Sequence, residues 1–122
     1  MHTALIIETD IDFSRGIGFI LEEQGFKILY AYNIQDARKI ISSQELTLIC
    51  MNQKIRGGKG TELAKEVREK GIKTPIVMIS GYPLEDLRDI TLETSIMKYY
   101  EKDKLDFGNL GNELLKISKI YK

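Results

Sequence analysis

The sequence predicts an α/β fold in which a parallel sheet is covered on both faces by helices. Short uncharged apolar runs alternate five times with longer segments, most of them amphipathic, along the 122 residues. Most of the runs are apolar at successive positions, which is typical of strands buried on both faces. A chain of this length with 43% apolar content can bury a core of its own. We therefore expect a single domain over residues 1–122.

The first half of the chain predicts three strands and two helices. Strands are expected over residues 4–7, 26–31 and 46–51. The first helix follows from apolar residues at helical spacing between Phe13 and Leu21, and Gly25 ends it. Asn33 is a suitable N-cap for the second helix, which runs through Ile41.

The second half opens with a glycine-rich turn at residues 57–60. A third helix carries Leu63, Ala64 and Val67 and is closed by Gly71, and a strand is expected over residues 76–79. A polar helix with a thin apolar stripe, an edge strand that carries one charge, and a last amphipathic helix are expected over residues 84–94, 96–100 and 107–121.

Composition and charge exclude several classes of function. Eighteen basic and eighteen acidic side chains give a net charge of zero, which argues against a nucleic-acid or polybasic membrane surface. No run approaches the roughly 20 apolar residues of a membrane span. The lone cysteine, Cys50, lies within a strand run and is interpreted as a small buried hydrophobe. We expect a soluble, cytoplasmic protein with small-molecule or protein partners.

Polar side chains follow the ends of the predicted strands. Ligands of open α/β sheets bind beyond the carboxyl ends of the strands, so these side chains are expected to share one crevice. The candidate residues are Glu8, Thr9, Asp10, Asn52, Ser80 and Lys102.

With these residues the chain resembles, from end to end, the CheY-like receiver domain of response regulators. The motifs are LIIETD at 5–10, LEEQGF at 21–26, LICMN at 48–52 before GGKG at 57–60, TPIVMISG at 74–81, and Tyr99 three residues before Lys102. The resemblance implies a three-layer, flavodoxin-like, doubly wound (βα)5 fold with sheet order 2-1-3-4-5.

The resemblance also implies a role for each crevice residue. In that family an aspartate at the end of the third strand accepts a phosphoryl group, and Mg²⁺ is held by it and by an acidic pair after the first strand. Ser80, Tyr99 and Lys102 match the switch hydroxyl, the switch aromatic and the phosphate-binding lysine. Asn52 occupies the phosphoacceptor position, and Thr9 occupies that of the acid that binds the metal directly.

These two departures change the expected chemistry. An amide oxygen is neutral and shares its lone pair with nitrogen, so Asn52 cannot form an aspartyl phosphate. Mg²⁺ prefers anionic oxygen ligands, and the vestigial site is reduced to Glu8, Asn52 and the Lys54 backbone carbonyl. Asp10 lies one residue too late to replace Thr9. We expect no cofactor, with Mg²⁺ binding weak or absent.

The remaining charged and polar side chains of the pocket are expected to pair with one another. Lys102 can bridge to Glu8 or Asn52, and we expect this contact to lock the pocket in one state. Asp103 and Arg56 replace two prolines that are usual in the family, so a trans bond after Lys102 and reshaped loops are expected.

The leading functional interpretation is a degenerate pseudo-receiver, which binds proteins and is not an enzyme. Partners are expected to be a histidine kinase, an output domain, another regulator, or a second copy of the chain. The candidate face combines the helix over residues 84–94, the strand over 96–100 and the last helix. It includes the charged Arg88, and Lys98 and Tyr100 are expected to be exposed.

Two alternatives stay open. The chain can be an active receiver that is phosphorylated weakly or at another group such as Asp10. It can also be a nucleotide- or other small-molecule-binding module on a flavodoxin-like fold, although no glycine-rich loop follows the first strand. The segment 57–61 lacks the spacing of a phosphate-binding loop and is better explained as a turn.

Overall fold

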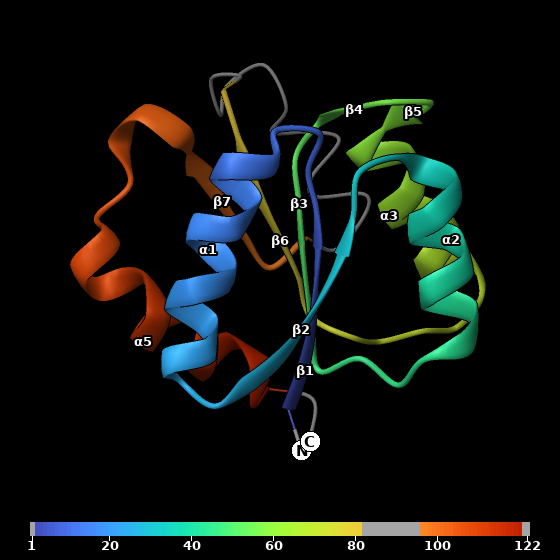
Figure 1. The fold of residues 1–122 in the computed structure, drawn as a ribbon. Coiled ribbons are helices and arrows are strands. Elements are labelled where there is room, and N and C mark those ends of the chain that lie inside the picture. Colours follow the sequence, from blue (N-terminus) through green and yellow to red (C-terminus); the bar gives the residue numbers. More distant parts are fainter. Residues whose placement is uncertain (1, 82–95, 121–122) are drawn as a thin grey trace.

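The computed structural model describes residues 2–81 and 96–120. Within these ranges five parallel strands form one sheet in the order β2-β1-β3-β6-β7 (Figure 1). Because β6 and β7 are the fourth and fifth strands of this sheet along the chain, this is the predicted order 2-1-3-4-5. The strands are β1 His2–Ile7, β2 Phe26–Ala31, β3 Leu48–Met51, β6 Ile76–Ser80 and β7 Lys98–Glu101. The predicted α/β fold with a parallel sheet is confirmed.

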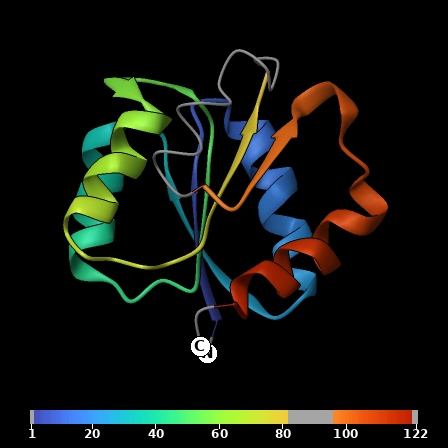
Figure 2. The same ribbon diagram turned by 180° about the vertical axis from the view of Figure 1, so that it is seen from behind.

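Helices cover both faces of this sheet (Figures 1 and 2). On one face lie α1 Ile11–Glu23 and α5 Phe107–Ser118, and on the other lie α2 Ile34–Ser43 and α3 Gly60–Glu69. These are the four α-helices of the described ranges. The helix predicted over residues 84–94, with its candidate partner residue Arg88, lies outside the described residues.

Local sequence signals explain where the helices begin and end. The side chains of Asp10, Asn33 and Asp106 cap α1, α2 and α5 by accepting a hydrogen bond from a backbone N–H in the first turn. Gly25 and Gly71 adopt positive φ angles of 93° and 79° just after α1 and α3, where a side chain would be strained.

The core lies between the sheet and its two helical layers. Successive strand residues point to opposite faces of the sheet, and helices cover both faces. All four residues of β3 are therefore buried. Ile49 and Met51 pack in the cluster on the α2 and α3 side, whereas Leu48 and Cys50 pack in the cluster on the α1 and α5 side. Cys50 is 2% exposed, as predicted for a small buried hydrophobe.

Several element boundaries differ from the prediction, because β1 begins at His2, β6 extends to Ser80 and α5 ends at Ser118. The central strand begins at Leu48, two residues later than the apolar run suggested, and β7 spans Lys98–Glu101. The glycine-rich segment is not a simple turn, because β4 Lys54–Ile55 pairs antiparallel with β5 Gly58–Lys59 and α3 starts directly at Gly60. None of the helices in the described ranges combines the length and the apolar character needed to cross a membrane.

Candidate functional site

Parallel pairing brings the ends of β1, β3 and β7 to one edge of the sheet. Ile7 is paired with Met51, and the Asn52 N–H donates to the Ile7 carbonyl at 3.0 Å, so Glu8 and Asn52 leave their strands side by side. Lys102 follows β7 at the same edge. An open cleft of about 570 Å³ lies there. It is lined by Glu8, Thr9, Asp10, Asn52, Lys54, Ile55, Arg56 and Lys102.

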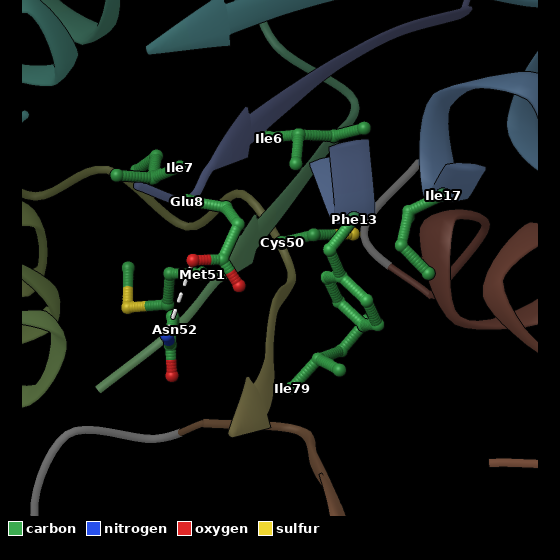
Figure 3. Close-up of a pocket in the computed structure, with 9 residues that line it drawn as sticks. All are labelled: Ile6, Ile7, Glu8, Phe13, Ile17, Cys50, Met51, Asn52 and Ile79. Atoms are coloured by element: carbon green, nitrogen blue, oxygen red, sulfur yellow. Dashed lines mark hydrogen bonds between the residues drawn. The ribbon is translucent and has the colours of Figure 1, made fainter. Parts of the chain in front are cut away.

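Glu8 is the buried charge of this cleft, with 4% of its surface exposed. Its Oε1 lies 2.5 Å from the Lys102 ammonium. Its Oε2 accepts hydrogen bonds of 3.2 Å from the Asn52 side-chain amide and from the Asp10 N–H. Figure 3 shows the Glu8 side chain reaching from the end of β1 to Asn52. The buried carboxylate therefore has a cation on one oxygen and two neutral donors on the other.

Of the two partners predicted for Lys102, Glu8 or Asn52, the structure pairs it with Glu8. The Lys102 side chain is 26% exposed, and Nζ lies 4.4 Å from the centre of the Phe13 ring. An ammonium over an aromatic face is stabilised by the ring quadrupole. The described residues contain no cis peptide bond, so the bond between Lys102 and Asp103 is trans, as predicted. A short 3₁₀ helix, Lys102–Lys104, starts here.

Asn52 has both ends of its amide engaged. While Nδ2 donates to Glu8, Oδ1 accepts from the Gln53 N–H at 2.8 Å. The loop after Asn52 is held by the Gly60 N–H, which donates to the Gln53 carbonyl at 2.8 Å. A Cβ at Gly60 would collide with the Asn52 carbonyl oxygen, so this close approach requires glycine.

Thr9 and Asp10 are exposed and both have structural contacts. The Thr9 hydroxyl oxygen accepts from the Arg56 N–H at 3.2 Å, which joins the loop after β1 to the β4–β5 hairpin. The Asp10 carboxylate accepts from the Phe13 N–H at 3.0 Å and thereby caps α1. These contacts orient Asp10 toward the first turn of α1.

A small apolar cavity of about 10 Å³ lies beneath Glu8 and Asn52 (Figure 3). A void of this size is at the lower limit for one water molecule. Its walls are otherwise apolar, so it is a small packing gap in the core that shares Glu8 and Asn52 with the cleft. The walls consist of Ile6, Ile7, Glu8, Phe13, Ile17, Cys50, Met51, Asn52 and Ile79.

Ser80 and Tyr99 occupy neighbouring positions of the sheet. Ser80 is fully buried at the end of β6 and is paired with Glu101, one residue before Lys102. Tyr99 is partly buried and packs against the cluster on the α2 and α3 side. Both residues thus lie near the edge of the sheet that carries Lys102.

The candidate partner face is described for β7 and α5. The Tyr100 hydroxyl donates to Glu113 Oε1 at 2.9 Å, and the Lys98 ammonium lies 3.6 Å from the same oxygen. Burial and the hydrogen bond to Glu113 raise the pKa of Tyr100 well above its ordinary value, so it stays a neutral donor. Lys98 is exposed as predicted, whereas Tyr100 was expected to be exposed and is partly buried, because its ring packs against the cluster on the α1 and α5 side.

Sequence reasoning missed two contributions to the cleft. Phe13 was assigned to the core, although its ring also contacts the Lys102 ammonium. In the sequence, Lys54 was considered only for its backbone carbonyl as a metal ligand, and Arg56 only because it replaces a proline. In the structure both residues line the cleft. Their position in the loop after Asn52 was a usable signal, because loops at the carboxyl ends of the strands form this kind of crevice.

Residues 4–112 match the family model described as the response regulator receiver domain. The chain therefore belongs to the response regulator receiver family of two-component systems. The match includes the cleft residues and every described strand and helix except the first two residues of β1 and the second half of α5.

Similar proteins agree with this assignment. The phosphate regulon transcriptional regulatory protein PhoB of Pseudomonas aeruginosa is 29% identical over 102 residues, which cover 82% of this chain and 44% of that protein. The chain thus spans less than half the length of this relative. A solved two-component response regulator from Clostridium difficile shares 26% identity at a TM-score of 0.89, with 100% of both chains covered. The receiver domain of the Francisella response regulator 1452 shares 20% identity and the fold, at a TM-score of 0.89 over 100% of both chains.

Proposed function

We propose that this chain is an atypical receiver, which works in two-component signal transduction without forming an aspartyl phosphate. The observation that carries the proposal is Asn52 at the end of β3, hydrogen-bonded at 3.2 Å to the buried Glu8. An amide oxygen is neutral and delocalised, so it offers no nucleophile to phosphorus. The module then acts by binding other proteins in the cytoplasm and not by catalysis.

The ion pair between Lys102 and Glu8 supports one fixed state of the pocket. The family resemblance gives the matching lysine the task of binding the phosphoryl group. Here the ammonium lies 2.5 Å from Glu8 and over Phe13, so it already has an anion and an aromatic face as partners. We infer that Glu8 and Lys102 neutralise each other, where a metal ion would otherwise neutralise the carboxylate and a phosphoryl group the ammonium.

The donor atoms around the cleft support the absence of a working Mg²⁺ site. Mg²⁺ requires nearly octahedral oxygen ligands and is held best by carboxylates. The Glu8 carboxylate is paired with Lys102, Thr9 contributes a neutral hydroxyl, and Asn52 turns an N–H group toward Glu8. In the described ranges, no three acidic, histidine or cysteine side chains are grouped for a metal. We propose that divalent cations do not regulate this domain.

The test is exposure of the protein to a small phosphodonor, such as acetyl phosphate, with Mg²⁺, followed by intact-mass measurement. We expect no mass increase for the native chain. The variant with both Asn52→Asp and Thr9→Asp restores two carboxylates and is expected to gain one phosphoryl group, which shows that donor and conditions are effective.

A phosphoryl adduct on the native chain would contradict the proposal. The variant Asp10→Asn then identifies the alternative, because phosphorylation at Asp10 would be lost in it. The geometry gives this alternative less support, since the Asp10 carboxylate is turned to the first turn of α1.

For the partner we propose a histidine kinase, an output domain, another regulator or a second copy of the chain, bound through β7, α5 and the segment before β7. Lys98 and Tyr100 converge on Glu113, which gives this face a fixed pattern of charge and aromatic surface. Lys98→Glu is expected to weaken self-association or partner binding in analytical ultracentrifugation. Lys27→Glu, an equal charge change at the exposed lysine of β2, is the control; equal effects of the two would contradict this choice of face.

A further inference from the structure

Two cations at the rim of the cleft have no ion-pair partner in the described parts of the chain. Lys54 and Arg56 belong to the loop and hairpin after Asn52, both are exposed, and both line the cleft. The ion pairs formed in the described ranges involve other lysines and arginines. Lys102, the third cation of the cleft, is already paired with Glu8.

The charges inside the cleft leave an excess of positive charge. Glu8 and Lys102 neutralise each other at 2.5 Å. Asp10 is the other lining acid, and its carboxylate is held by the N-terminus of α1. With Lys54 and Arg56 also in the lining, its side chains sum to one positive charge, from three bases and two acids. A concave surface of this kind concentrates anions.

Thr9 adds a neutral donor to the two cations. Its oxygen accepts from the Arg56 N–H at 3.2 Å, which leaves the hydroxyl hydrogen free to point at a ligand. A carboxylate at this position would repel an anion. Thr9 in place of an acid therefore removes a metal ligand and also removes a charge that would repel an anion from the cleft.

We propose that this cleft binds the phosphate group of a small molecule noncovalently, with Lys54, Arg56 and Thr9 as its ligands. The group can come from a phosphomonoester or from free phosphate. The volume of about 570 Å³ lies within the roughly 300–1,000 Å³ of small-molecule sites and leaves room for an organic moiety beside the phosphate. The proposal is independent of how the domain selects its partner.

The test is a titration of the ¹⁵N-labelled protein with ribose 5-phosphate, inorganic phosphate and ribose, at constant ionic strength and with EDTA present. EDTA removes divalent cations, and none of these compounds is a phosphodonor, so the outcome does not depend on phosphorylation. We expect saturable amide shifts at Thr9, Lys54 and Arg56 with the two phosphates and none with ribose. Tighter binding of ribose 5-phosphate assigns the site to a phosphomonoester, and equal binding assigns it to free phosphate.

Variants locate the site. Arg56→Ala and Lys54→Ala are each expected to weaken binding about tenfold. Thr9→Asp, which removes no cation, is expected to weaken it at least as much. Lys65→Ala is the matched control, because it makes the same charge change at an exposed position of α3. Shifts that do not saturate, or an equal loss in Lys65→Ala and Arg56→Ala, would overturn the proposal.

Discussion

The Lys102 ammonium lies 2.5 Å from Oε1 of Glu8, whose side chain is only 5% exposed. Glu8 directly follows β1 and Lys102 directly follows β7, 94 positions apart in the chain. Their contact spans β3 and β6, which lie between β1 and β7 in the sheet. Removal of one partner leaves a buried charge without compensation, whereas removal of both does not.

Lys102→Met is expected to lower the free energy of unfolding by about 2–3 kcal/mol, because it leaves the Glu8 carboxylate unpaired. Urea unfolding measures this loss. The matched control is Lys104→Met, which breaks a 2.9 Å ion pair with Glu101 in which the lysine is 75% exposed. Exposed pairs contribute little, so the control should lose less than about 1 kcal/mol.

Glu8→Gln combined with Lys102→Met is expected to be less destabilising than the sum of the two single changes, since no charge is left buried. The difference is the coupling energy of the pair, measured in the same urea experiments. Additive losses would show that Lys102 contributes through packing on Phe13 and not through Glu8.

Mg²⁺ is expected to give no saturable heat in calorimetric titration of the native chain. The physical reason is the loss of two carboxylates at Thr9 and Asn52 and the pairing of the third with Lys102. The double variant Thr9→Asp, Asn52→Asp is expected to bind Mg²⁺, since it restores both charges. Tight binding by the native chain would show that Mg²⁺ displaces Lys102 from Glu8.

Gly60→Ala is expected to cost about 1–3 kcal/mol, because its Cβ would collide with the Asn52 backbone carbonyl, which cannot move without breaking the loop. The control is Gly16→Ala in the middle of α1, where a Cβ meets no atom within 4 Å. Alanine favours helix over glycine, so this variant should gain about 0.5–1 kcal/mol. Thermal unfolding distinguishes the two, and similar effects would contradict the close approach at Gly60.

The buried thiol of Cys50 predicts a loss of stability in alkali. Burial raises the pKa of Cys50 from its ordinary value of 9.0 to about 12. Between these values the unfolded state releases the proton and the folded state keeps it, so the free energy of unfolding falls as pH rises. From pH 8 to pH 10 the native chain should lose about 1.4 kcal/mol more than Cys50→Ala. Parallel pH profiles of the two proteins would exclude this contribution.

Much of the fold followed from signals that are local in the sequence. The apolar runs gave the strands because successive side chains of a buried strand all contact the core. Asn33 and Gly25 marked helix ends because a capping amide and a positive φ angle act on neighbouring backbone groups. The hairpin at residues 54–59 was missed because its two strands are only two residues long and carry no periodic pattern.

For the candidate site too, local sequence signals identified some residues but not the contacts that they make. Asn52 and Thr9 were recognised from the sequence because each follows directly on a strand or its end, and side-chain chemistry alone excludes an aspartyl phosphate there. The partners of these residues were harder to predict. Whether Lys102 would choose Glu8 or Asn52 depended on a separation that no local pattern encodes.

The sequence by itself determined the alternation of strands and helices, the family and the absence of a carboxylate at Asn52, since these are properties of residue type and spacing. The tertiary structure alone decided that Lys102 pairs with Glu8 over the ring of Phe13, and that Lys54 and Arg56 border the same cleft. The reason is that these contacts join loops from different strands, and their distances are set by sheet register and loop conformation, which arise only when the whole core is packed.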